Sequence, residues 1–533
     1  MVRGTRGIQK NHNAMNVYLI APVPSFGSDI VLADYQLPLD EPYALVAAAG
    51  IATVAALFGD TFKLRLCDEI IEPVDFDDSS EVICLSMNVS QAARGIQIAR
   101  RFRALGRTVI MGGAHVSLDP ESFAGEADCL VIGEFEPIAK QVTEDLRAGN
   151  LQPRYQGAKA DLAHAPLPRW DLYRNDRAIS GVVQTSRGCP FECNFCDVIQ
   201  YLGRVQRHKP PESVILELQQ LYDLGYRSIN LSDDNFTAYR QRARTLLQAL
   251  DAWNGRDGRE PVQFSTQMSM DIARDPDLLA LCNEAGLRNA FVGIETDNEE
   301  ALKASLKRQN LRQDLVAQCS RIVAQGVTVQ SGIMVGFDTD DLGSFDRLFR
   351  FGMSLPVVQL RVAVLVAPVA TPLHAQFKAE GRLLDDTHLD AFAVGNYWTN
   401  ILPKNMTREQ LAEGTTWLVE ALMEPDNVIH RFEQYAAILK PAPEHLRHTA
   451  RHRHGATNVP PMLQLIRKGA KDPGGRRVIE AVDALTKSRP EISGDLINLL
   501  AIHLNSHLFV EQQKRKRPQP PRCPSEHLIA IAR

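Results

Sequence analysis

Residues 184–196 have the sequence Gln-Thr-Ser-Arg-Gly-Cys-Pro-Phe-Glu-Cys-Asn-Phe-Cys, which places Cys189, Cys193 and Cys196 within eight residues. Soft thiolates this close together suit zinc or an iron–sulfur cluster. A structural zinc site would require a fourth Cys or His at a similarly short spacing, and none follows soon. A cluster held by only three cysteines leaves one iron open to an outside ligand. The pattern therefore favours an iron–sulfur cluster, with zinc or three structural thiols as the alternatives.

The composition is that of an ordinary globular protein. The chain has 533 residues, of which 44% are hydrophobic and 23% charged, and the length predicts three to four domains. A net charge of −5 offers no general attraction for nucleic acid, so none is expected as a partner. The other cysteines stand singly, which predicts a reducing, cytoplasmic location rather than a disulfide framework. They are Cys67, Cys84, Cys129, Cys282, Cys319 and Cys523.

No segment is expected to cross a membrane. Residues 1–14 are basic and lack an apolar core, so they predict a flexible tail rather than a secretory signal. Tyr43–Gly59 has no charged residue and approaches the length of a membrane span. This run is rich in alanine and lies between two strand-like segments, which favours a buried helix of an α/β domain.

Residues 15–150 alternate between short apolar runs and helical patterns, which predicts a doubly wound, Rossmann-like parallel sheet. Such sheets bind ligands beyond the carboxyl ends of their strands. The expected strands are Asn16–Ala21, Lys63–Asp68, Val82–Met87, Thr108–Met111 and Cys129–Ile132. The expected helices are Leu45–Phe58, Ala92–Leu105 and Pro137–Arg147.

After a proline-containing linker at 151–178, a second βα series occupies 179–395 and predicts a partial (β/α)6 barrel. The expected strands are Gly181–Thr185, Ser228–Leu231, Gln263–Met268, Asn289–Ile294, Thr328–Val335 and Gln359–Val366. The three cysteines directly follow the first of these strands, at the end where barrel enzymes carry their chemistry.

The motif Cys-x3-Cys-x-Phe-Cys, preceded by a β-rich run and Ser-Arg-Gly, resembles the radical S-adenosylmethionine (radical SAM) superfamily. The resemblance implies that Cys189, Cys193 and Cys196 each bind one iron of a [4Fe–4S] cluster and that SAM chelates the fourth. The reduced cluster then cleaves SAM to a 5′-deoxyadenosyl radical, which abstracts hydrogen from an unactivated carbon. The role of the protein is to place the radical and exclude water.

The N-terminal domain resembles the cobalamin-binding domain of one large radical SAM subgroup. Gly112, Gly113 and His115, followed by Gly133 and Glu134, fit the pattern of that subgroup and are the expected cofactor contacts. The Asp-x-His-x-x-Gly signature that supplies an axial histidine in many cobalamin proteins is absent, so cobalamin would be held without a protein histidine. The alternative is a domain that has kept the fold but lost the cofactor. The sequence favours neither of two roles for His115, a ligand contact or a histidine that only forms part of the loop.

The same resemblance implies SAM contacts at other strand ends. The acidic pair Asp233 and Asp234 would lie near the methionine ammonium, and Glu295 near the ribose, although all three suit turns or helix caps. Phe195, within the cysteine motif, is also expected to contact the cofactor. The run 332–336 resembles the superfamily's Gly-x-Ile-x-Gly segment, whose backbone packs along adenine; it contributes Ile333 and Gly336.

Residues 396–510 predict a helical extension, and its Pro-Lys-Asn-Met-Thr start at 403–407 resembles the branch that includes the hopanoid methylases. This extension is the expected lid. Residues 511–533 predict an exposed basic, proline-rich tail. A histidine cluster in an arginine-rich stretch would bind a metal if helical but better fits a solvated basic patch. It consists of His445, His448, His452 and His454.

The predicted activity is cobalamin-dependent methyl transfer to an unactivated carbon of a lipid or secondary metabolite. Its cofactors would be a [4Fe–4S] cluster, SAM and cobalamin, and its partners a small-molecule or lipid substrate and an electron donor such as flavodoxin or ferredoxin. The alternative is a radical SAM isomerase, cyclase or oxidant, or an enzyme that cleaves a different C–S bond of SAM. A cluster-bearing redox or regulatory protein without substrate turnover is the third possibility.

Overall fold

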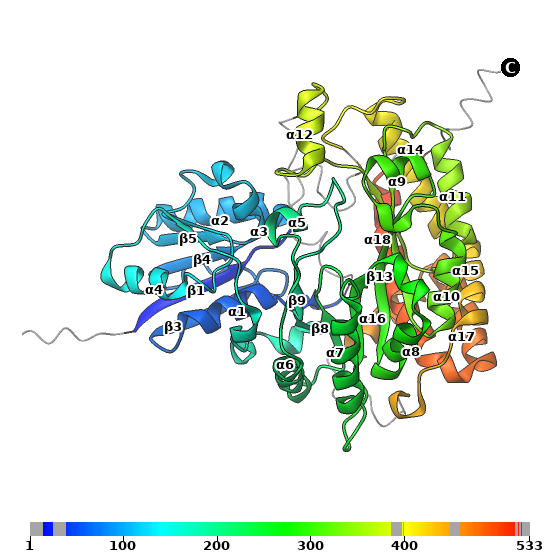
Figure 1. Cartoon of the computed structure of the whole chain (residues 1–533), viewed down its shortest axis with the longest axis horizontal. Helices are drawn as coiled ribbons and strands as arrows, with labels where there is room; N and C mark the ends of the chain where they lie inside the picture. The colour runs from blue at the N-terminus through cyan, green and yellow to red at the C-terminus, as the bar shows by residue number, and fades with distance from the viewer. Residues whose placement is uncertain are drawn as a thin grey trace, which may run out of the picture.

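The computed structural model describes residues 14–24, 39–384, 397, 399–447, 459–517, 521 and 524. Two α/β units stand side by side, and the C-terminal helices pack on the side of the second unit away from the first (Figure 1). The predicted tail at 1–14, apart from its last residue, lies outside the described residues, as do His448, His452, His454, Cys523 and most of the segment after 517.

The first unit is a six-stranded sheet in which every neighbouring pair is parallel, in the order β3-β1-β4-β5-β6-β7. This order reverses between β1 and β4, which makes the sheet doubly wound, as predicted. The strands are β1 (Met15–Ala21), β3 (Phe62–Asp68), β4 (Val82–Ser86), β5 (Thr108–Gly112), β6 (Cys129–Ile132) and β7 (Arg154–Gln156).

Helices cover both faces of this sheet. Alternate side chains of the central strands pack into two separate cores: Leu19 belongs to the core on the α1 and α4 side, and Ile20 to the core on the α2 and α3 side. Because both faces are buried, these strands are almost continuously apolar. The helices are α1 (Ala49–Phe58), α2 (Ala92–Ala104), α3 (Ala114–Leu118) and α4 (Ala139–Ala148).

The second unit is a curled half-barrel of parallel strands in the order β2-β8-β11-β12-β13-β14-β15. Its strands are β2 (Ala44–Val46), β8 (Ala178–Val183), β11 (Ser228–Leu231), β12 (Gln263–Met268), β13 (Leu287–Glu295), β14 (Thr328–Val335) and β15 (Leu360–Val364). The helices that follow its strands include α6 (Pro211–Asp223), α7 (Arg240–Trp253), α8 (Pro276–Ala285), α9 (Glu299–Ala304), α10 (Leu315–Ala324) and α11 (Ser344–Ser354).

Two strands connect the units in a way that the sequence did not predict. β2 comes from the first part of the chain, yet it pairs with β8 of the half-barrel, through Ala44 with Ala178 and Val46 with Ser180. β7 lies in the segment predicted as a linker, yet it completes the edge of the first sheet. Both strands are only three residues long, and such runs carry no periodicity that could be recognised in sequence.

After β15 comes α12 (Pro372–Ala379), which lies within the range predicted for the barrel. The helices of the predicted C-terminal extension are α14 (Arg408–Met423), α15 (Pro425–Ile438), α16 (Val459–Gly469), α17 (Pro473–Ser488) and α18 (Ser493–Lys516). α18 contacts the amino ends of the barrel strands, where Asp495 pairs with Arg288 at 2.8 Å and Asn498 bonds Gln263. In the described part of the chain, no helix combines the length and apolar character that a membrane span requires.

Candidate functional site

The cysteine loop follows β8 and begins with β9 (Ser186–Arg187), which pairs antiparallel with β10 (Arg207–His208). Burial raises the pKa of the Cys196 thiol to about 12, and it also raises the pKa of Cys189. Backbone N–H groups already point at these sulfurs, from Phe191 to Cys189 and from Val198 to Cys196. Buried thiols of this kind deprotonate only when a cation or metal compensates the charge, so the donor set fits a metal cluster.

Cys193 lies close enough to the other two thiols that its charge raises the pKa of both Cys189 and Cys196. The Gln309 amide donates to Cys193 Sγ at 3.7 Å. Within the described residues, no group of three His, Cys, Asp or Glu side chains could hold one metal ion, so the loop offers no mononuclear zinc site of that kind. A cluster shares its ligands among several irons and does not require the sulfurs to meet at one atom.

A buried ion pair stands beside the thiols at the end of β13. Lys307 donates to Glu295 Oε1 at 2.6 Å, and both side chains are almost fully buried. Burial alone would lower the pKa of Lys307, but the Glu295 carboxylate and the Cys193 and Cys196 thiolates raise it above its usual value. Glu295 has a φ of +68°, in the left-handed region that non-glycine residues rarely occupy. Strain of this kind is concentrated at functional sites.

The two predicted acidic residues after β11 have different surroundings. Asp233 is 1% exposed and accepts the backbone N–H groups of Thr185 and Ser186, both at 2.8 Å. Asp234 accepts one N–H group, from Gly188 at 2.8 Å. Burial raises the pKa of Asp234 to about 6. Asp233 therefore braces the start of the cysteine loop, whereas Asp234 faces the glycine just before Cys189.

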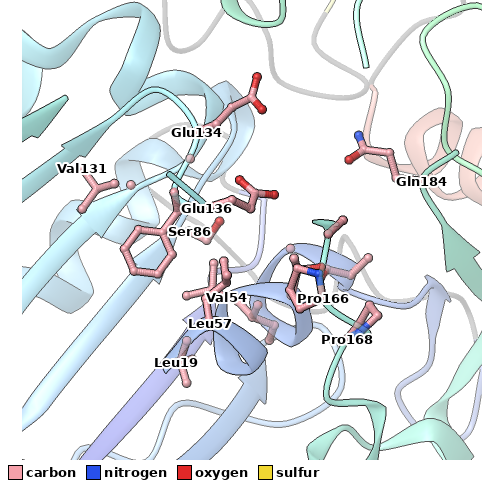
Figure 2. Close-up of a pocket in the computed structure, with 18 of the residues that line it drawn as sticks. Leu19, Val54, Leu57, Ser86, Val131, Glu134, Glu136, Pro166, Pro168 and Gln184 are labelled. Atoms are coloured by element: carbon pink, nitrogen blue, oxygen red, sulfur yellow. The ribbon is translucent and has the colours of Figure 1, made fainter. Parts of the chain in front are cut away.

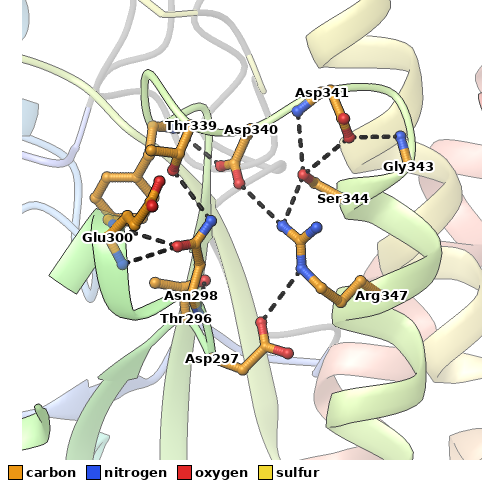
Figure 3. A network of polar contacts seen from close by, with 12 residues as sticks. Thr296, Asp297, Asn298, Glu300, Thr339, Asp340, Asp341, Gly343, Ser344 and Arg347 are labelled. Carbon is orange, nitrogen blue, oxygen red and sulfur yellow. Dashed lines mark hydrogen bonds and ion pairs between the residues drawn. The ribbon is translucent and has the colours of Figure 1, made fainter. Parts of the chain in front are cut away.

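The glycine-containing run on β14 ends in a tight turn that Asp340 holds. Gly336 has a φ of +105°, and its N–H donates to Asp340 at 2.9 Å. Figure 3 shows how Asp340 joins a network that includes Arg347 of α11, which also contacts Asp297 after β13. Asn298 reaches across to Thr339 at 3.2 Å. The carboxyl ends of β13 and β14 are thus locked together.

Two other predicted cofactor residues contribute mainly to apolar packing. The Ile333 side chain is 1% exposed and packs among Phe345 and Leu411 on the helix side of β14. Only its backbone is therefore available on the inner face, as the predicted adenine contact requires. Phe195 packs against the cluster that contains Phe337, next to the Gly336 turn.

A cavity of about 310 Å³ lies where the two units meet. Its walls include Ser86, at the carboxyl end of β4, and Gln184, just beyond β8 of the half-barrel (Figure 2). An apolar part of the lining, with Leu19, Val54 and Leu57, comes from the sheet and the helix α1 that covers it. The cavity thus combines a polar opening toward the cysteine loop with an apolar interior.

Four of the five residues predicted to contact cobalamin line this cavity, namely Gly112, Gly113, Gly133 and Glu134. The two glycines with positive φ serve close packing: a Cβ on Gly113 would lie 2.5 Å from the Met87 backbone, and one on Gly133 would lie 2.3 Å from a carbonyl oxygen. The structure does not bring His115 to the cavity lining. It is buried in α3, edge-on to the Phe123 ring.

Glu134 also connects the two units. Its carboxylate is 2% exposed and pairs with Arg187 at 2.7 Å and Arg207 at 2.6 Å. Arg187 pairs in addition with Glu136, at 2.6 Å. Arg187 stands two residues before Cys189, so this ion cluster joins the cavity wall to the cysteine loop. We name these four residues, Glu134, Glu136, Arg187 and Arg207, the inter-unit ion cluster.

Sequence reasoning missed most of this cluster. The Ser-Arg-Gly that precedes the cysteines contains Arg187 and was the available signal, but its partner lies 53 residues away in the other unit. Sequence reasoning also missed the ion pair of Lys209 with Glu217. Both side chains are buried from solvent, and both line the cavity. Burial raises the pKa of Glu217, although Lys209 opposes this effect.

A half-barrel with three thiols at the carboxyl end of its first strand, joined to a doubly wound unit with a cavity at the junction, defines a class of cofactor-dependent enzymes. Residues 183–352 match the radical SAM superfamily, and residues 371–478 match a domain of unknown function (DUF4070). The chain is 30% identical to the hopanoid C-2 methylase of Rhodopseudomonas palustris, over 70% of this chain and 72% of that protein. The chain therefore belongs to the radical SAM superfamily, in the branch that includes the hopanoid methylases.

A second relative is an uncharacterized methyltransferase of Synechocystis, 33% identical over 64% of this chain and 65% of that protein. Among solved structures, the radical SAM methyltransferase TsrM from Kitasatospora setae, with cobalamin and a [4Fe–4S] cluster bound, matches 90% of this chain and 99% of its own. The TM-score is 0.60 at 14% identity, so this likeness concerns the fold. The predicted family, fold class and radical SAM enzyme class are confirmed.

Proposed function

We propose that this chain is a cobalamin-dependent radical SAM methyltransferase that methylates an unactivated carbon of a lipid or secondary metabolite. The observation that carries the proposal is the position of the junction cavity. It lies at the carboxyl ends of the doubly wound sheet, where such sheets bind ligands, and the inter-unit ion cluster joins its wall to the cysteine loop. Two cofactors bound at these places would face each other across one junction.

Cys189, Cys193 and Cys196 would hold the cluster, and their N–H donors and the nearby Lys307 would stabilise the thiolates. Bound SAM supplies a deoxyadenosyl radical, and bound cobalamin supplies a transferable methyl group. The protein must orient these groups and keep water out.

The proposed SAM contacts are the residues that surround the cluster loop. Asp234 and Glu295 would accept hydrogen bonds from the ammonium and the ribose, while the backbone of Ile333 and the Gly336 turn would follow the adenine. Phe195 would support that turn through its packing next to Phe337. Asp233 would act through the loop and not by direct contact.

The proposed cobalamin site is the junction cavity. The backbone at Gly112, Gly113 and Gly133 would approach the corrin, and the apolar interior between the sheet and α1 would take an apolar substituent. Among the described residues, the cavity lining contains no histidine, and the proposed site would hold cobalamin without a histidine ligand. Glu134 would have a double role, in the cavity wall and in the inter-unit ion cluster.

We also propose a cytoplasmic location, an electron donor such as flavodoxin or ferredoxin, and no nucleic-acid partner. The eight cysteines that the structure describes are all free thiols, in keeping with a reducing compartment.

Anaerobic expression with added cobalamin tests the proposal directly. The purified protein should hold corrin near one equivalent, measured by its absorbance. Ser86→Phe, which fills the cavity from the end of β4, should lose most of the corrin yet retain its iron. A corrin-free protein that is fully active would instead support a radical SAM enzyme without methyl transfer.

The cluster assignment has its own prediction. Cys193→Ala should abolish cluster assembly, because two thiolates cannot hold it, whereas Cys282→Ala should retain full iron content. Cys282 is fully buried and lies on α8, outside the motif. Iron content and visible absorbance after anaerobic reconstitution make the comparison, and an intact cluster in Cys193→Ala would contradict the assignment.

A further inference from the structure

Arg361 lies on the inner face of the half-barrel. In the register of β14 with β15, Ser331 pairs with Leu360 and Gly332 pairs with Arg361. Leu360 and Val362 pack with the core that contains α11 and α14 side chains, so they face outward. Because side chains alternate along a strand, Arg361 and its partner Gly332 face inward.

Within the described part of the chain, Arg361 has no carboxylate partner on this face. Across the residues that the structure describes, no ion pair or hydrogen bond of its guanidinium is found, and its side chain is exposed. Its one aromatic neighbour is Phe291 of β13, whose ring centroid is 6.0 Å from the guanidinium carbon. An arginine side chain remains protonated near neutral pH, so the Arg361 guanidinium is positively charged. The inner face therefore presents a cation that nothing in the described chain neutralises.

Apart from Phe291, Met334 and Ala363, the rest of this face is mainly polar, and its charged side chains are paired. The inward positions of β11 to β14 carry mainly hydroxyl and amide side chains, most of them partly exposed. They are Ser228, Asn230, Ser265, Gln267, Asn289 and Gln330. The first carboxylate along the inward side of β13 is Glu295, and it is already paired with Lys307. Gly293 and Gly332 lie side by side in register next to Arg361; the head groups of Glu295 and Lys307 lie over Gly293, and the Phe291 ring lies next to Gly332.

We propose that the substrate is a polar small molecule with a carboxylate or phosphate group, and that Arg361 binds this anion on the inner face of the half-barrel. This inference rests on the proposed function and narrows its substrate class. Arginine is suited to planar, bidentate recognition of carboxylate and phosphate. A purely apolar lipid would leave the guanidinium and the row of amides desolvated without partners, which is costly.

SAM itself carries a carboxylate and is the competing source of the anion. For the carboxylate of SAM, the structure offers a different cation, Lys307. The Lys307 ammonium lies close enough to the Cys193 and Cys196 thiolates to interact with their charges. Arg361 is the second residue of β15 and lies level with the middle of the sheet, below Glu295. If Arg361 binds the substrate anion, SAM should leave its labelling unchanged, whereas if it binds the SAM carboxylate, SAM should protect it.

Arginine labelling with p-hydroxyphenylglyoxal, read out by mass spectrometry, separates these sources on the reconstituted holoprotein. Millimolar inorganic phosphate should slow labelling of Arg361 by about fivefold, with SAM present or absent. Arg101 is the internal control, since it is exposed, is stacked on Phe76 and has no carboxylate partner among the described residues. Equal phosphate sensitivity at Arg101, or protection of Arg361 by SAM that phosphate does not increase, would overturn the proposal.

Variants of Arg361 provide a second test of the proposal. Arg361→Gln should lose phosphate binding measured by calorimetry, and Arg361→Lys should retain part of it. SAM affinity, measured by equilibrium dialysis, should change by less than about twofold in both. A large loss of SAM affinity would assign Arg361 to the cofactor. If the wild-type protein fails to bind cluster or corrin, the proposed function fails, whereas phosphate binding at Arg361 is measured independently of both.

Discussion

At the scale of single residues, Asp233 and Asp234 show how neighbours in sequence acquire different roles. Both follow β11, but Asp233 is enclosed by Thr185, Ser186 and Arg242, whereas Asp234 accepts a single backbone N–H. A carboxylate that satisfies two buried N–H groups mainly holds its loop in place. The residue with spare acceptor capacity is the better candidate for a ligand contact.

Variants of Asp233 and Asp234 should separate the loss of the cluster from the loss of SAM binding. Asp233→Ala should lower iron content together with SAM binding, because the start of the cysteine loop loses its brace. Asp234→Asn should retain the cluster and weaken SAM binding by about tenfold, since a charge-assisted hydrogen bond is replaced by a neutral one. Iron analysis and equilibrium dialysis with SAM distinguish the two. The reverse assignment would follow if Asp233→Ala kept its iron.

At the scale of secondary-structure elements, the packing of α14 on α11 depends on one glycine. A Cβ on Gly414 would lie 2.4 Å from the ring of Phe345, which is fully buried. Helix propensity alone would favour alanine by about 1 kcal/mol at this position. The close contact opposes that preference, because a packed aromatic ring cannot move aside without displacing its neighbours.

Gly414→Ala should therefore lower the free energy of unfolding by about 1–3 kcal/mol, as overpacked cores do. Phe345→Leu in the same chain should recover part of this loss, because the smaller side chain makes room for the new methyl group. Thermal melting of the single and double variants provides the comparison. A Gly414→Ala protein more stable than the wild type would show that propensity dominates.

A second feature at this scale is a buried histidine on α18. His503 is fully buried beside Phe432 and close to the charges of His507 and Arg431, and burial lowers its pKa to about 3. The unfolded chain takes up this proton near pH 6.5. Because the folded state binds the proton less well, stability is complete above pH 6.5 and falls as the pH drops toward 3.

The expected loss is about 1.4 kcal/mol for each pH unit below 6.5. His503→Leu removes the titrating group at similar volume, so its fall in Tm between pH 7.5 and pH 5.5 should be smaller than that of the wild type by about 1 °C. His430→Leu serves as a control on α15, because His430 is exposed. If the Tm of the wild type and of His503→Leu depended on pH in the same way, His503 would not be the cause of the loss of stability at low pH.

At the scale of the whole molecule, the junction between the two units depends on buried charge. Glu134 receives two guanidinium groups and the Ala160 N–H, so its pKa is lowered although burial alone would raise it. Removing one partner of a buried ion pair leaves the others uncompensated, which costs more than the pair contributes. The inter-unit ion cluster therefore acts as a clamp between cavity wall and cysteine loop.

Glu134→Gln should destabilise the protein on the order of 3 kcal/mol and increase hydrogen exchange in both the 154–160 segment and the cysteine loop. Glu126→Gln is the matched control, because its pair with Arg100 lies on the surface and should matter much less. Unchanged exchange at the loop in Glu134→Gln would show that the two units are held by other contacts.

The sequence alone determined the class of both units and the position of the cysteine motif. Several barrel strands were predicted with their observed bounds: Ser228–Leu231, Gln263–Met268 and Thr328–Val335 match β11, β12 and β14. Local patterning suffices here because each strand's apolar alternation reflects the faces that it buries. The cysteine spacing is local as well, since one loop carries all three ligands.

Tertiary structure alone decided which distant side chains meet. Three features depend on partners that are 29 to 134 residues away in the chain: the pairing of β2 with β8, the ion pair of Glu134 with Arg187, and the inward position of Arg361. The withdrawal of His115 from the cavity is of the same kind, because Phe123 and the α3 turn bury a residue whose motif suggested a ligand. Local sequence encodes propensity and period, whereas long-range contacts depend on the packing of whole elements against one another.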